Sequence, residues 1–65
     1  MWIVIHMIKG KDAAERVSDR LKAEGVLVRM RPVYKALSPQ ENYFELQVPQ
    51  SEIQEAREVL MELGL

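Results

Sequence analysis

The sequence contains no cysteine, one histidine and only four aromatic residues, and it has three glycines and three prolines. Without cysteine, neither disulfides nor thiolate metal sites can stabilise the fold, and a reducing compartment is expected. A chain of about 60 residues buries only about 60% of its unfolded surface. We therefore expect residues 1–65 to form a single domain that gains stability by forming an oligomer.

Excess charge and long apolar runs are also absent. Nine basic and ten acidic residues give a net charge of −1, which argues against strong nonspecific attraction to nucleic acid or to an anionic membrane. The apolar run at residues 1–8 is far shorter than the roughly 20 residues of a membrane-spanning helix. It also lacks the basic start of a secretory signal. We expect a cytoplasmic protein that does not contact a membrane.

The run at residues 1–8, MWIVIHMI, is the most apolar part of the chain. Strand residues point alternately to the two faces of a sheet, and here both sets are apolar. We therefore expect a strand that is covered on both faces. Ile3 and Ile5 are assigned to the face that packs against the helices.

Two helices and two further strands follow. Asp12 with Glu15, and Ser51 with Gln54, have the spacing of capping boxes at helix starts. Gly25 and Gly64 are expected to end the two helices. Residues 26–31 alternate as a second strand that lies at a sheet edge or ends at Pro32. Residues 33–42 are expected to be a loop, and residues 43–48 form a third strand with its apolar side chains at Phe44, Leu46 and Val48.

This βαββα order predicts an α+β fold. A right-handed crossover places both helices on one face of the sheet. The expected architecture is a ferredoxin-like sandwich that lacks its last strand, with strand order 1-3-2. The core is expected to contain the apolar strand residues above and Val28, covered by helix residues of both helices: Val17, Leu21, Ile53, Ala56 and Leu60.

Several segments carry a family resemblance: AERVSDRLKAEG running into VLVRM, and YFELQVPQS followed by AREVL. Together with the apolar start, they resemble the prokaryotic signal-transducing protein family, small bacterial proteins of unknown function, over nearly the whole chain. The resemblance implies a ferredoxin-like or nitrogen-regulator-like fold and a regulatory role. In nitrogen-regulator proteins the loop between the second and third strands contacts partners, and residues 33–42 have that position. It is a resemblance of pattern, so no active residue is transferred.

No catalytic motif is present. His6 is the only histidine, and a metal site or catalytic triad needs further converging groups. There is no P-loop, nucleophile elbow or dinucleotide-binding glycine pattern. We expect neither enzyme activity nor a metal or other cofactor, and His6 is interpreted as a structural or interface residue.

The candidate binding residues lie on the predicted open sheet face and in the loop: Arg29, Arg31, Tyr34, Lys35 and Tyr43. The expected function is a non-enzymatic regulatory module for a protein partner or a small effector. The alternative is single-stranded nucleic-acid binding, with aromatic rings of Trp2 and Tyr43 stacking on bases. A competing interpretation pairs Arg29 with Glu45 across strands and buries Trp2 in an oligomer. Nucleic acid is the less favoured partner, since the chain is not basic.

The first strand also predicts a homodimer. It is apolar on both parities, and the predicted fold leaves it at a sheet edge. A two-fold pairing, edge to edge or through stacked open faces, would cover Trp2, Val4 and His6.

Overall fold

The chain forms a three-stranded antiparallel sheet and two α-helices. The computed structural model describes residues 1–65, with β1 (Trp2–Lys9), α1 (Lys11–Ala23), β2 (Arg29–Pro32), β3 (Tyr43–Pro49), a short 3-10 helix (Gln50–Glu52) and α2 (Ile53–Glu62). The strand order is β1-β3-β2, so β3 is central and both other strands are edges. The predicted α+β class and strand order are confirmed.

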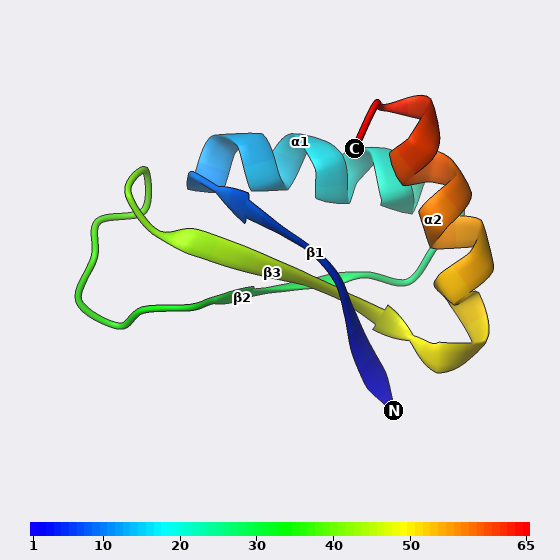
Figure 1. Cartoon of the computed structure of the whole chain (residues 1–65), viewed down its shortest axis with the longest axis horizontal. Helices are drawn as coiled ribbons and strands as arrows, with labels where there is room; N and C mark the ends of the chain where they lie inside the picture. Colours follow the sequence, from blue (N-terminus) through cyan, green and yellow to red (C-terminus); the bar gives the residue numbers. More distant parts are fainter.

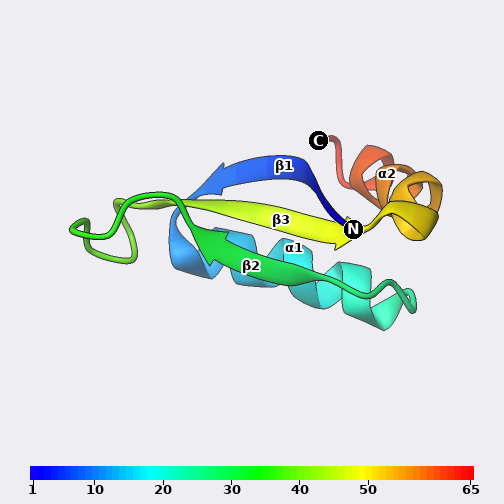
Figure 2. The same ribbon diagram turned by 90° about the horizontal axis from the view of Figure 1, so that it is seen from below.

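Both helices lie on the same side of the sheet (Figure 1). Seen from below, α1 runs behind β3 and β2, and α2 stands at the end of the sheet where β3 finishes (Figure 2). Neither helix is long and apolar enough to cross a membrane. Because both helices lie on one side, the sheet has one face covered by helices and one face without cover.

The core lies between the sheet and the helices. The predicted residues Leu46 and Val48 are fully buried, and Phe44 is 7% exposed. They belong to the apolar parity of β3, which confirms the assignment of its faces. The helices contribute buried side chains from one stripe each: Ala14 and Leu21 of α1, and Ala56, Val59 and Leu60 of α2.

A β-bulge divides β1 into two halves. Val4 lies opposite Gln47 and His6 lies opposite Leu46, so Ile5 is an extra residue in the strand. Ile5 and Ile8 both pack against the core. Because the extra residue shifts the alternation, the covered face receives odd-numbered residues before the bulge and even-numbered residues after it. A single odd–even alternation along the whole strand could not have assigned the residues of both halves to the correct face of the sheet.

The second strand begins later than predicted. Val26 and Leu27 are not in the ladder, because their backbone N–H groups bond elsewhere, to the Leu21 carbonyl at 3.0 Å and to Glu52 Oε1 at 3.0 Å. Val26 is nevertheless buried in the core and Val28 packs against it. The predicted inward parity is thus correct, although the pairing with β3 starts only at Arg29.

The two predicted capping boxes are wrong. Gly10 is the N-cap of α1 and Glu52 that of α2, and neither helix start has a side-chain cap bond. At the start of α1, the N–H of Gly10 donates to the Asn42 carbonyl at 2.8 Å, and the N–H of Lys11 donates to the Pro39 carbonyl at 3.0 Å. Gly10 has φ +92°, a conformation that favours glycine. At the start of α1, tertiary contacts therefore satisfy backbone donors in place of the expected Asp12 side chain.

The predicted helix ends are confirmed. After α1, the N–H of Val26 donates to the Leu21 carbonyl and that of Gly25 donates to the Lys22 carbonyl. After α2, Leu65 and Gly64 make the equivalent pair of bonds. This is the Schellman motif, in which a glycine with positive φ satisfies the last carbonyl groups.

Candidate functional site

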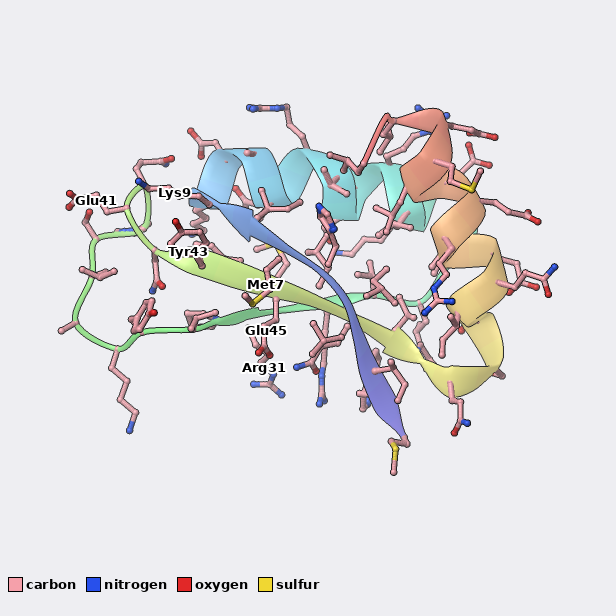
Figure 3. All side chains as sticks on the ribbon, viewed as in Figure 1. Met7, Lys9, Arg31, Glu41, Tyr43 and Glu45 are labelled. Carbon is pink, nitrogen blue, oxygen red and sulfur yellow. The ribbon has the colours of Figure 1, made fainter.

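The uncovered side of the sheet is the first candidate site. We use the name open face for its residues, which the strand registers place together: Trp2, Val4, Met7, Lys9, Arg29, Arg31, Tyr43, Glu45 and Gln47. Met7, Glu45 and Arg31 form one row across all three strands. Figure 3 shows these three side chains on the side away from α1.

A network of side chains crosses the open face from edge to edge. Arg29 Nε donates to Gln47 Oε1 at 2.7 Å, and Gln47 Nε2 donates to Glu45 Oε1 at 3.0 Å. The Arg29 guanidinium lies 4.4 Å from the centre of the Trp2 ring, which is cation–π distance. These contacts hold Arg29 and Gln47 in place across β3. The face is therefore partly preorganised before any partner binds.

The predicted pairing of Arg29 with Glu45 is wrong. The β2–β3 register places Arg29 opposite Gln47 and Arg31 opposite Glu45. Arg31 and Glu45 do not form an ion pair, since the salt bridges of the chain are those of Arg20 with Glu24 and Glu62. Arg31 is an exposed cation without a charged partner.

The apolar side chains of the open face are concentrated on β1, where Lys9 at the end of the strand is the one charged residue, and the two arginines lie on β2. Along β1 the face presents Trp2, then Val4 at 45% exposure and Met7 at 53% exposure. Along β2 it presents Arg29 and Arg31. The apolar side chains of β1 are thus separated from the arginines of β2 by the side chains of β3.

The charges of the open face and of α2 differ in sign. The open face has three cationic side chains, Lys9, Arg29 and Arg31, against one carboxylate, Glu45. The helix α2 has the opposite balance, with Glu55, Glu58 and Glu62 against Arg57. The near-neutral chain therefore presents an excess of positive charge on its one uncovered sheet face.

The second candidate site is a hollow beneath the 33–42 loop, with a volume of about 440 Å³. Its buried residues are Asn42 and Phe44, and its exposed residues are Pro32, Leu37 and Pro39 with Lys11, Tyr34 and Lys35. It is the one hollow of the molecule. The open face has no hollow of its own, and the hollow at the loop is a depression that is open to solvent.

Asn42 fixes the loop that forms the hollow. Its side chain is 3% exposed. Its Oδ1 accepts bonds from the N–H groups of Tyr34 at 3.1 Å and Tyr43 at 2.8 Å, and its Nδ2 donates to the Tyr34 carbonyl at 2.6 Å. One amide thus closes both ends of the loop, next to the bonds that the loop makes with Gly10 and Lys11. The 33–42 segment is a loop as predicted, but it is anchored.

The structure separates the residues predicted as candidates. Arg29, Arg31 and Tyr43 lie on the open face, together with Trp2 and Val4. Tyr34 and Lys35 line the hollow. The expected grouping of His6 with Trp2 and Val4 is wrong, because the bulge at Ile5 places His6 opposite the buried Leu46. No three His, Asp or Glu side chains converge as metal ligands would.

Three contributors were not found by sequence reasoning. Met7 and Lys9 belong to the open face only because of the bulge, and no pattern in the sequence predicts that bulge. Lys11 lines the hollow because the loop folds back on the start of α1. One signal for Lys11 was present: it is a cation in the first turn of a helix, where the helix dipole favours anions.

Comparison with known protein families, with curated proteins and with solved structures yields no match. The function therefore has to be argued from the open face and the hollow.

Proposed function

We propose that this protein is a small non-enzymatic regulatory module that binds a protein partner through its open face. The observation that supports this most is a flat sheet face with no helix over it, on which exposed apolar side chains stand beside unpaired cations. Scattered apolar residues need no explanation, but a contiguous apolar and charged face is typical of an interaction surface.

The chemistry of the open face indicates the kind of partner. The apolar column of β1 would receive apolar side chains, and the unpaired Arg31 would receive a carboxylate. Arg29 is already held against Trp2 and Gln47, so less side-chain entropy is lost when a partner contacts it. We therefore propose a protein surface that combines acidic and apolar residues.

We also propose that the fold is ferredoxin-like and that the chain is related to the prokaryotic signal-transducing proteins. The antiparallel order 1-3-2 with both helices on one side supports a ferredoxin-like sandwich lacking its last strand. The resemblance to the prokaryotic signal-transducing proteins supports a regulatory role in a bacterial cytoplasm. Both proposals agree with a module that binds rather than catalyses.

Affinity capture with matched variants tests the partner proposal. The immobilised chain would be compared with the double variant Met7→Asp/Arg31→Glu, and with the control Arg57→Glu on α2. All three positions are exposed, so the fold should tolerate the changes. We expect mass spectrometry to find a protein that the wild type and the control retain and the double variant loses. Equal retention by all three chains would contradict a partner site on the open face.

We also propose that the free chain forms a homodimer along the apolar column of Trp2, Val4 and Met7, so that dimerisation and partner binding compete for this surface. Contact limited to β1 keeps the arginines of β2 at the periphery, which avoids like-charge repulsion between two cationic faces. Edge-to-edge pairing of β1 is less suitable, because a bulge in an edge strand disturbs regular pairing with another chain. Sedimentation equilibrium should give a dimer that Val4→Lys dissociates. A monomer at high micromolar concentration would exclude it.

Single-stranded nucleic-acid binding is the alternative function. Tyr43 is 40% exposed and lies opposite Lys9, a pairing of ring and cation that could hold a base and its phosphate. The carboxylate of Glu45 at the centre of the face opposes this. A labelled oligonucleotide that binds with an affinity falling steeply with salt would favour the alternative.

A further inference from the structure

The hollow beneath the 33–42 loop combines apolar walls with cations only. Pro32, Leu37, Pro39 and Phe44 supply apolar surface, and Lys11 and Lys35 are the charged residues that line it. No carboxylate belongs to the lining, and neither lysine forms a salt bridge. A small anion with an apolar body would therefore match both parts of the surface.

Size and rigidity support a small ligand. The volume of about 440 Å³ falls in the range of about 300–1,000 Å³ that ligand sites have. Asn42 holds both ends of the loop, and the N–H of Lys11 donates to the Pro39 carbonyl at 3.0 Å. The hollow is thus held open by hydrogen bonds before a ligand enters, which lowers the entropic cost of binding.

The position of Lys11 is a second, independent observation. It is the first residue of α1, where its charge opposes the helix dipole, so it adds nothing to the stability of the helix. Residues that break a local rule without a stabilising contact are expected at functional positions. Lys35 is the other cation that lines the hollow.

We propose that the hollow is an effector site for a small apolar carboxylate, which packs on Leu37, Pro39 and Phe44 and whose charge is bound by Lys11 and Lys35. The site is separate from the open face, so it does not depend on the protein partner proposed above. The proposal names the class of ligand that the 33–42 loop would bind, which the sequence alone did not indicate.

Backbone NMR with 2-naphthoate as the probe tests this site. We expect amide shifts to be confined to residues 10–14 and 32–44. Exposed ion pairs are worth about 0.2–1 kcal/mol, so Lys11→Gln and Lys35→Gln should each weaken binding roughly two- to fivefold. The control Lys22→Gln, at the other end of α1, should bind as the wild type does. The neutral 2-naphthol should bind to the wild type no better than naphthoate binds to the double variant Lys11→Gln/Lys35→Gln.

The apolar part of the site needs its own comparison. Leu37→Ser should weaken naphthoate binding and leave the spectrum folded, because Leu37 is 44% exposed. Inorganic phosphate should bind at least tenfold more weakly than naphthoate. Equal binding of phosphate, shifts centred on Val4 and Met7 of the open face, or lysine variants that bind as the wild type does would each overturn the proposal.

Discussion

The two faces of β3 differ completely although they alternate residue by residue. Phe44, Leu46 and Val48 are buried under the helices. Tyr43, Glu45 and Gln47, one position away from them, are exposed or half-buried on the open face. The covered face therefore stabilises the fold through burial of apolar area. Side chains on the open face can be substituted at little cost to stability. The same strand serves the core and the proposed partner site without conflict.

The largest effect should come from truncating the covered face. Leu46→Ala removes a fully buried side chain and should lower the free energy of unfolding by about 2–5 kcal/mol in urea titrations. Glu45→Ala, the neighbouring residue on the open face, should change it by less than about 0.5 kcal/mol. A loss below half a kcal/mol in Leu46→Ala would mean that the faces are assigned the wrong way round.

The next largest loss of stability should come from Asn42, the residue that directly precedes β3. Asn42→Ala leaves the N–H groups of Tyr34 and Tyr43 without their side-chain acceptor. These N–H groups are partly buried, so leaving them unpaired should cost about 1–3 kcal/mol. Amide exchange in residues 33–42 should accelerate more than in the rest of β3. Unchanged exchange there would show that other contacts hold the loop and the hollow.

The bulge in β1 can be tested with two neighbouring residues. Ile8 packs against the core and Met7 is 53% exposed on the open face. Ile8→Ala should cost about 1 kcal/mol, roughly half the value for full burial, and Met7→Ala should cost less than half of that. The reverse order would indicate a strand without the bulge, in which Met7 shares a face with Ile3 and Ile5.

The smallest effect concerns the network on the open face. Arg29→Gln removes the guanidinium from the Trp2 ring, and an exposed cation–π contact is worth about 0.5–1 kcal/mol. Trp2 is the single tryptophan, so its fluorescence emission should move to longer wavelength as the ring gains water. Arg31→Gln is the matched control and should leave the emission unchanged.

Local patterns in the sequence were sufficient for much of the fold. The alternation of Phe44, Leu46 and Val48 identified the covered face of β3, and Gly25 and Gly64 identified the helix ends, because these signals depend on neighbours in the chain. The choice of Arg29, Arg31 and Tyr43 as residues of one open face followed from the same alternation and the strand order. The same reasoning could not divide the candidates between a flat face and a hollow.

What only the tertiary structure decided depends on contacts between distant segments. The bulge at Ile5 arises from fitting β1 against β3, and it moved His6 away from Trp2 and Val4. The start of α1 is satisfied by carbonyls of Pro39 and Asn42 rather than by Asp12. The same contacts bring Lys11 and Lys35 into the lining of one hollow. A sequence pattern reports the preference of a segment for a structure, whereas a bulge, a cap or a site is set by which distant groups satisfy the backbone.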